Sequence, residues 1–498
     1  MPPPVHAAAI HRFCNRPLGI NAMRSSLILR SVIALSALAV LTGCGLGTGP
    51  ATSSTVTPIV TAKPVATGRA FGGRQAITGA TVQLWGVGTS GYGSPSTPLT
   101  FTYSGNSVTA TTSNGTGVGG NVTNGNNSLA AGSFTLSPGG TPLYTCPASN
   151  LVYITVVGGN SGGGGNNAQS VLMAGLGSCT TLVANAATTF IDIDELTTVA
   201  TAYALARFSN SYSAIGAPST NQTGLSNAFA AINEIVNTTT GVASGPALPA
   251  GATLPIAEIN TLGDILAYCV NSTGTTTGPG DGTPCGSLFA DTTPSGGSAP
   301  TDTFGAALAI ALTPVNNAIF GLTSSSGPYQ TALASSPNNW MIGVHYTGGG
   351  LASPTAVAVD NSGNVWVANS PASPATGSVS EFSSIGTALS TSTGYISGSI
   401  SSPSGIAIDT SGNAWVSNSG NSSVTKIAPL GASASNYTGG GLNLPSSISI
   451  DGSGNIWVTN KGNNSITQLS SSGGALSPTG GYVGGGLNQP TGIAVDPQ

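Results

Sequence analysis

A fourfold internal repeat between residues 346 and 498 constrains the fold of this chain more than any other feature. Each unit begins with a tyrosine, has a proline eight residues later, and has an aspartate six residues after the proline. In the first three units the aspartate opens an Asp-x-Ser-Gly-Asn sequence that leads to a tryptophan and then to an asparagine. Markers at fixed offsets predict one structural unit used several times in succession. The markers are Tyr346, Tyr395, Tyr437 and Tyr482; Pro354, Pro403, Pro445 and Pro490; Asp360, Asp409, Asp451 and Asp496; and Trp366, Trp415 and Trp457.

Each unit is predicted to be a small antiparallel meander. Small and β-branched residues alternate before the aspartate, as in Ala356-Val357-Ala358-Val359, which is typical of a strand near a crowded centre. The Asp-x-Ser-Gly-Asn turn follows, where glycine can take a positive φ and the aspartate can accept hydrogen bonds from the turn. The tryptophan strand and a third strand, at Ser378 to Phe382 in the first unit, complete the pattern.

The shared sequence P-x-[AGS]-[IV]-[AS]-[IV]-D-x-S-G-N-x-W-V-x-N resembles the NHL repeat, whose family builds six-bladed β-propellers. That family is related to the virginiamycin B lyase and SMP-30/gluconolactonase propellers. The resemblance implies a propeller fold that serves mostly as a binding platform, with some enzymes among its relatives. The sequence ends at Pro497-Gln498, after three blades and one inner strand. We therefore expect an incomplete propeller over 341–498, as a piece of a longer protein or as an open stack with unpaired edges.

The charged residues of the array argue against catalysis and RNA binding. The relatives that are enzymes need metal-binding carboxylates and histidines, whereas residues 346–498 hold seven charged residues, no histidine and no arginine. Four of the seven are the repeated aspartates, which the blade itself explains. Two lysines cannot form a basic face for RNA. The repeated tryptophans favour packing between blades over carbohydrate stacking. A lyase or lactonase remains the alternative, and it would depend on Glu381 or His345.

The N-terminal segment predicts export and lipid anchoring. A basic stretch from Met23 to Arg30 precedes an apolar run from Ser31 to Leu41 that is too short to span a bilayer. The run ends in Leu-Thr-Gly-Cys at Cys44, which resembles the lipobox of bacterial lipoproteins, and the resemblance implies that Cys44 is lipidated and becomes the mature N-terminus. We expect 1–43 to be a leader and signal peptide, with Met23 as the initiator, and 44–66 to be a tether.

The charge of the mature chain limits its partners. Residues 44–498 contain six lysines and arginines against fourteen aspartates and glutamates. Such a chain cannot neutralise phosphates, so we expect no nucleic-acid partner. We expect membrane contact through the lipid of Cys44 alone, at the outer membrane of the cell envelope, and an unknown protein or glycan as the partner of the propeller.

Two further regions are expected between the tether and the repeat. Residues 67–180 show β patterns such as Thr81 to Trp85 and Leu151 to Val157, and Gln75 to Leu84 resembles the opening of carboxypeptidase-regulatory-like and other Ig-like sandwich domains. Residues 181–340 change to a helical period. The expected helices are Asp194 to Leu205, Leu225 to Val236, Ile256 to Val270 and Phe304 to Leu312. The predicted fold class is thus mainly β and multidomain, with a β-sandwich, a small helical middle domain and the blades.

Four cysteines and three acids are the remaining site candidates. Cys146, Cys179, Cys269 and Cys285 follow Cys44, and an even number in an exported chain predicts two disulfides. Local pairing, of Cys146 with Cys179 and of Cys269 with Cys285, is the simplest of three connectivities. The acids Asp192, Asp194 and Glu195 have the spacing of a cation site, but the start of a helix explains them better. We expect no metal and no cofactor.

Overall fold

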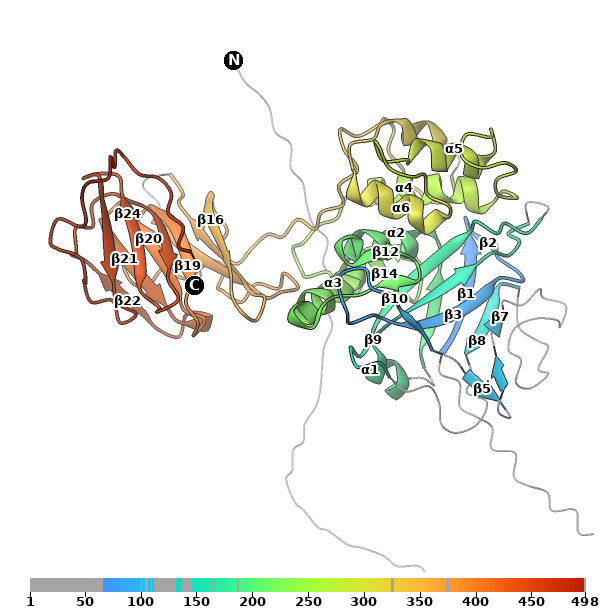
Figure 1. The fold of residues 1–498 in the computed structure, drawn as a ribbon, viewed down its shortest axis with the longest axis horizontal. Helices are drawn as coiled ribbons and strands as arrows, with labels where there is room; N and C mark the ends of the chain where they lie inside the picture. Colours follow the sequence, from blue (N-terminus) through green and yellow to red (C-terminus); the bar gives the residue numbers. More distant parts are fainter. Residues whose placement is uncertain are drawn as a thin grey trace, which may run out of the picture. The chain divides into compact units, whose positions relative to one another are not determined.

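The structure of this protein is a computed structural model that describes residues 66–99, 101–103, 106–108, 110–111, 131–136, 146–162, 165–185, 188–323, 327–372 and 376–496. The expected leader, signal peptide and tether, with Cys44, lie outside these residues except for Ala66. Within the described ranges, no helix is both long and apolar enough to cross a membrane. We call residues 66–345 the body and residues 346–496 the blade array, and each is described by itself (Figure 1).

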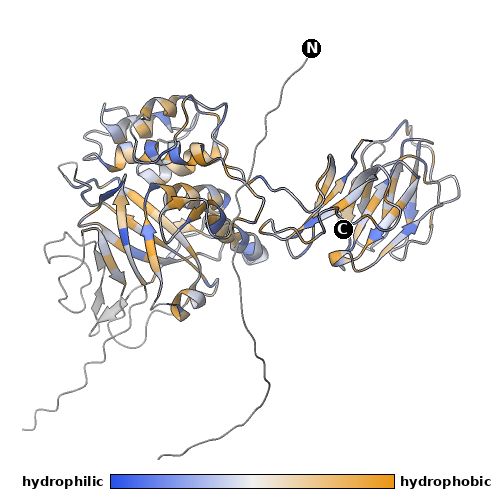
Figure 2. Ribbon diagram, turned by 180° about the vertical axis from the view of Figure 1, so that it is seen from behind, coloured by the Kyte–Doolittle hydropathy of each residue, from blue (hydrophilic) through white to orange (hydrophobic). Residues whose placement is uncertain are grey.

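Two β-sheets of the body face each other across a hydrophobic core. In the first sheet, β1 (Ala66–Gly72) pairs in parallel with β11 (Phe190–Ile193) and antiparallel with β8 (Ser133–Leu136) and β2 (Gln75–Ala76). The second sheet has the order β10-β9-β3-β4, with β7 beside β3. Its strands are β3 (Thr81–Gly86), β4 (Thr97–Pro98), β7 (Ala110–Thr111), β9 (Leu151–Val157) and β10 (Val171–Ser178). Figure 2 shows mostly hydrophobic residues along the strands in the middle of the body.

Strand β9 is buried on both faces. Six of its seven residues are buried, because Val152, Ile154 and Val156 point into the core between the sheets, while Leu151 and Tyr153 point toward the helices. A continuous run rich in β-branched residues is typical of such a central strand.

Helices form a third layer on the second sheet. Residues Tyr153, Val171 and Met173 share one core with helices α2, α3, α4, α5 and α6 (Figure 1). The expected division between a sandwich ending at residue 180 and a separate helical domain therefore runs through a common core. The helices are α1 (Cys179–Ala184), α2 (Glu195–Ala204), α3 (Gln222–Ile235), α4 (Ile256–Val270), α5 (Pro284–Asp291) and α6 (Thr303–Leu312).

Three threonine hydroxyls join the helices to the free edge of β10. The N–H groups of Val171, Met173 and Gly175 have no neighbouring strand on that side and instead donate to Thr303, Thr198 and Thr201 at 2.8, 2.9 and 3.1 Å. Each hydroxyl in turn donates a hydrogen bond of 2.7 Å to a backbone carbonyl. All six bonds are buried, so the three outward N–H groups of this edge keep hydrogen-bond partners where water cannot reach them.

Short elements complete the body. The two-stranded ladders are β5 (Phe101–Tyr103) with β6 (Asn106–Val108), β12 (Ser209–Ser211) with β13 (Ala214–Ile215), and β14 (Val236–Asn237) with β15 (Val242–Ala243). Three 3₁₀ turns lie at Ala206–Phe208, Ser219–Asn221 and Ala318–Leu322.

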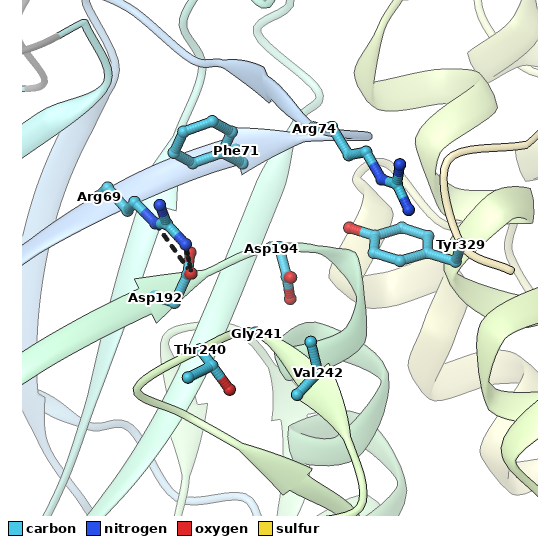
Figure 3. Close-up of a pocket in the computed structure, with 9 residues that line it drawn as sticks. All are labelled: Arg69, Phe71, Arg74, Asp192, Asp194, Thr240, Gly241, Val242 and Tyr329. Atoms are coloured by element: carbon cyan, nitrogen blue, oxygen red, sulfur yellow. Dashed lines mark hydrogen bonds and ion pairs between the residues drawn. The ribbon is translucent and has the colours of Figure 1, made fainter.

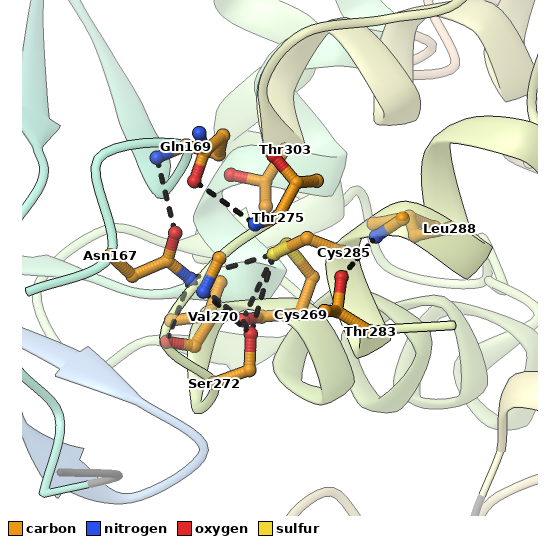
Figure 4. Close-up of a disulfide and its surroundings, with 12 residues drawn as sticks. Asn167, Gln169, Cys269, Val270, Ser272, Thr275, Thr283, Cys285, Leu288 and Thr303 are labelled. Atoms are coloured by element: carbon orange, nitrogen blue, oxygen red, sulfur yellow. Dashed lines mark hydrogen bonds between the residues drawn. A yellow bond between two sulfur atoms is a disulfide. The ribbon is translucent and has the colours of Figure 1, made fainter. Parts of the chain in front are cut away.

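Both disulfides form between the nearer cysteines. Cys146 bonds to Cys179 across 33 residues, and Cys269 bonds to Cys285 across 16. The second bond joins the last turn of α4 to the first turn of α5, and the Asn167 amide donates to the Cys269 carbonyl beside it at 2.8 Å (Figure 4). The Cys269–Cys285 disulfide therefore fixes both ends of the Gly- and Thr-rich loop between α4 and α5.

The blade array contains three antiparallel sheets, each in sequence order. Tyr395, Tyr437 and Tyr482 each pair with the third strand that precedes them, for example Tyr395 with Val379, so these tyrosines end one blade rather than open the next. The strands are β16 (Pro354–Val359), β17 (Val365–Asn369) and β18 (Ser378–Phe382); β19 (Pro403–Ile408), β20 (Ala414–Asn418), β21 (Ser423–Ile427) and β22 (Ala434–Tyr437); and β23 (Pro445–Ile450), β24 (Ile456–Asn460) and β25 (Ser465–Leu469). A 3₁₀ turn at Pro429–Gly431 precedes β22.

The fourth inner strand is not formed within the described residues. Residues 490–496 have no strand assignment, although the Pro490 carbonyl accepts a bond from Ser446 at 2.6 Å, as the Pro445 carbonyl does from Ser404 at 2.7 Å. The segment therefore begins in the position of an inner strand. A strand needs a ladder partner, and the described part of this unit contains no tryptophan strand to supply one.

We predict that the Thr198 hydroxyl is essential to the edge of β10. A Thr198→Val variant keeps the shape of the side chain but leaves the Met173 N–H buried without an acceptor, which should cost about 1–3 kcal/mol. Native-state hydrogen exchange on peptides that cover β10 measures this loss in the full chain. Thr198→Ser keeps the hydroxyl and is the control. Equal protection in Thr198→Val and the native chain would contradict this role.

Candidate functional site

The repeated aspartates are engaged by their own turns. Asp409 Oδ1 accepts from the N–H groups of Ser411 and Asn413 at 3.0 and 2.9 Å, and Oδ2 accepts from the Asn413 amide at 2.9 Å and from Trp415 Nε1 at 3.0 Å. The turns at Asp360 and Asp451 repeat these bonds. The turn glycines Gly363, Gly412 and Gly454 have φ near 80°. Asp496 is exposed and makes no such bond within the described residues.

Trp366 and Trp415 pack between neighbouring blades. Trp366 is fully buried and shares a core with Ile406 of the next blade, and Trp415 does the same with Ile448. Each tryptophan also lies against the tyrosine that ends its own blade, with ring centroids 5.9, 5.5 and 6.2 Å apart for Trp366, Trp415 and Trp457. Val357, which matches Ile406 by position, is 64% exposed because no described blade precedes it.

One buried asparagine in each blade ties its loop to its third strand. The Asn418 amide donates to Ser423 Oγ at 3.2 Å and to Thr425 Oγ1 at 2.9 Å, and its oxygen accepts from the Ser401 N–H at 3.3 Å. Asn369 and Asn460 make the same set of bonds. These asparagines follow the tryptophans in the repeat and serve the blade itself.

One position of the third strand changes from blade to blade. Glu381, Lys426 and Gln468 occupy it in turn. Glu381 is buried and accepts from Tyr395 Oη at 2.7 Å and from the Leu430 N–H at 3.1 Å, and burial raises its pKa. Gln468 accepts from Tyr482 in the same way at 3.1 Å. Lys426 instead lies 3.5 Å from Asp409 and covers the Trp415 ring.

His345, the other residue of the enzyme alternative, lies in the body. Its backbone pairs with Thr253 and its side chain is exposed.

Two of the three acids at the start of α2, Asp192 and Asp194, line a cavity of about 270 Å³ in the body. Asp194 is the N-cap of α2 and accepts from the Thr197 N–H at 2.8 Å in a capping box, the role expected from the sequence. Asp192 binds Arg69, and Glu195 points away from Asp192 toward the turn after β1, where it accepts from the Gly73 N–H at 3.1 Å. Figure 3 shows Asp192 and Asp194 among the residues that line the cavity.

Burial raises the pKa values of three acids in or near the cavity, Asp194, Glu195 and Asp264. Burial, with the neighbouring charges of Glu195 and Asp192, raises the pKa of Asp194 well above its usual range. Burial also raises the pKa of Glu195 to about 7, although Tyr329 Oη donates to it at 2.5 Å. Burial raises the pKa of Asp264 to about 6. Such shifts accompany functional sites as well as structural networks.

Sequence reasoning missed several residues of this region. Arg69 and Arg74 lie more than 100 positions before Asp192 and Tyr329 in the chain, so no local pattern connects them. The one available signal is rarity, because few arginines follow Cys44 in the sequence. Among the described residues, no group of three or more histidine, cysteine, aspartate or glutamate side chains is arranged to hold a metal ion.

Comparison with known proteins gives only distant similarities. No family model matches the chain, and no curated protein matches it. A catalytically inactive virginiamycin B lyase from Staphylococcus aureus with quinupristin is 20% identical, with 27% of this chain and 43% of that chain covered and a TM-score of 0.22. A nidogen/laminin complex is 17% identical, with 26% of this chain and 47% of that chain covered and a TM-score of 0.22. A gluconolactonase from Xanthomonas campestris is 22% identical, with 28% of this chain and 53% of that chain covered and a TM-score of 0.21.

These neighbours are β-propeller proteins, and this chain spans about half the length of each. At such low TM-scores the similarity supports no argument about activity. The propeller-like character of the array rests on its own three sheets, which do not close into a ring within the described residues.

We predict a pH-dependent stability from Glu195. The pKa of Glu195 is about 7 in the folded chain, above its usual value in an unfolded chain. Glu195 therefore adds to the free energy of unfolding below about pH 4.3, and this stabilisation is lost as the pH rises through 7. Glu195→Gln removes this ionisation, and the loss of stability between pH 5 and 8 should shrink by roughly 2–3 kcal/mol.

Hydrogen exchange at several pH values, corrected for the intrinsic rate, measures the change. Asp291→Asn, a change at an acid of α5 outside the cavity lining, is the control. An unchanged pH dependence in Glu195→Gln would contradict the shift.

Proposed function

We propose that this protein is exported, anchored by a lipid on Cys44, and presents its blade array as a non-enzymatic binding or structural platform. One observation supports the platform half of the proposal: most charged side chains of the blades are already engaged in hydrogen bonds or ion pairs within the array. Three of the four repeated aspartates, Glu381 and Lys426 all bond within the array. Lys461 and Asp496 are the charged side chains of the described array that make no hydrogen bond or ion pair.

Uncommitted carboxylates are what metal binding or proton transfer requires. A surface of serine, threonine and asparagine with few charges suits recognition of a neutral partner, such as a glycan or an uncharged protein face. The array therefore supports binding better than catalysis.

The alternative is a lyase or lactonase related to the neighbours. Incubation of the purified full chain with quinupristin and with gluconolactone tests it directly, and we expect no turnover of either compound. Turnover that is lost in Glu381→Gln would replace the platform proposal with the enzyme. Glu381→Gln is a suitable variant because Gln468 makes the equivalent bond to Tyr482 in the third blade.

The anchoring half of the proposal predicts lipid incorporation at Cys44. Bacterial cells that express the chain and grow with labelled palmitate should label the native protein but not Cys44→Ser, which should also leave the membrane fraction. Cys14→Ser is the matched control, because Cys14 lies in the segment that we expect to be removed. Labelling of Cys44→Ser, or an unlabelled native protein, would contradict the anchor.

A further inference from the structure

The body concentrates its arginines at one place. Arg69, Arg74 and Arg207 are the only arginines after Cys44, and two of them line the cavity of about 270 Å³ beside the start of α2. Guanidinium groups bind oxyanions through pairs of N–H donors. Because the chain has so few cationic residues, the presence of both Arg69 and Arg74 in one cavity points to a site for an anion.

Asp192 and Phe71 hold the Arg69 side chain in place. Its Nε and Nη2 donate to one oxygen of Asp192 at 2.9 and 2.5 Å, and its guanidinium lies over the Phe71 ring, 4.9 Å from the centroid. The Asp192 side chain is 4% exposed, whereas that of Arg69 is 44% exposed. A guanidinium has five donors, so the buried acid orients Arg69 and leaves three N–H groups for a ligand.

Arg74 occupies a backbone position that disfavours it. Gly73 and Arg74 form the two-residue turn between β1 and β2, with φ of 54° and 76°. Turns with two positive φ values prefer glycine or asparagine, so arginine destabilises this one. Glu195 fixes the turn through the Gly73 N–H. The Arg74 side chain makes no hydrogen bond to any described residue. A strained residue without an internal bond points to a role outside stability.

The surroundings of the two arginines define the kind of anion. Figure 3 shows Arg69 with Phe71 on one side of the cavity and Arg74 with Tyr329 on the other, with Asp194 between them. Asp192 balances the charge of Arg69, and burial raises the pKa of Asp194, which favours its neutral form, so about one positive charge, that of Arg74, remains for a ligand. A doubly charged phosphate carries more charge than this and would be repelled by Asp192. The rings of Phe71 and Tyr329 offer apolar surface to a carbon skeleton.

We propose that this cavity binds a small organic carboxylate, whose oxygens bond to Arg69 and Arg74 and whose carbon skeleton lies against Phe71 and Tyr329. The site is separate from the blade array and does not depend on the function proposed for the blades.

Calorimetric titration of the purified full chain with benzoate, glucuronate and inorganic phosphate tests the proposal, with benzamide as the neutral analogue of benzoate. We expect at least one carboxylate to bind and benzamide not to bind. Arg74→Gly should weaken binding by about tenfold or more, because a charged hydrogen bond is lost. The same variant should melt at a higher temperature than the native chain, because glycine relieves the positive φ.

Arg207→Ala removes an exposed arginine elsewhere in the body and should bind the carboxylate as the native chain does. Arg69→Lys keeps the charge next to Asp192 but loses the planar fork, so it should also bind more weakly. Three results would overturn the proposal: no binding of either carboxylate to the native chain, unchanged affinity in Arg74→Gly, or phosphate binding as tight as that of the carboxylates.

Discussion

The buried edge of β10 is the constraint on which the body depends. A sheet edge that faces helices loses its hydrogen bonds to water, and an aliphatic helix face cannot replace them. Here Thr198, Thr201 and Thr303 accept from alternate N–H groups of β10 and return their own protons to the backbone. The chain has few charged residues, and hydroxyl groups supply these buried hydrogen bonds. The same chemistry recurs in the blades, where Asn418 bonds to Ser423 and Thr425.

Local patterns in the sequence predicted much of the structure. The expected helix from Ile256 to Val270 coincides with α4, and the uniform run from Leu151 to Val157 is the central strand β9. Asp194 caps α2 because an acid before an amphipathic run has a strong local signature. The turn of each blade is equally local, since all donors to its aspartate lie within six residues.

Contacts between distant segments could not be predicted in this way. The four residues of β11 pair with β1 across more than 100 positions and carry no periodicity that points to a partner. The threonines of α2 look like ordinary helical positions until β10 lies beside them. Helix α5 was missed because it begins at Pro284 in a stretch rich in glycine and threonine, where only the N-cap Thr283 and the proline at the first position suggest a helix. Arg69 and Arg74 meet Asp192 and Tyr329 only in three dimensions.

The different ranges of these contacts have a kinetic consequence. Each blade closes its turn, its tryptophan bond and its asparagine network within a few tens of residues, and such short loops form quickly. The body cannot complete its first sheet until residues 190–193 reach β1, nor satisfy Val171 until Thr303 arrives 132 residues later. Long loops close more slowly. We therefore expect the blades to acquire structure one after another, while the body folds later, in a single cooperative step.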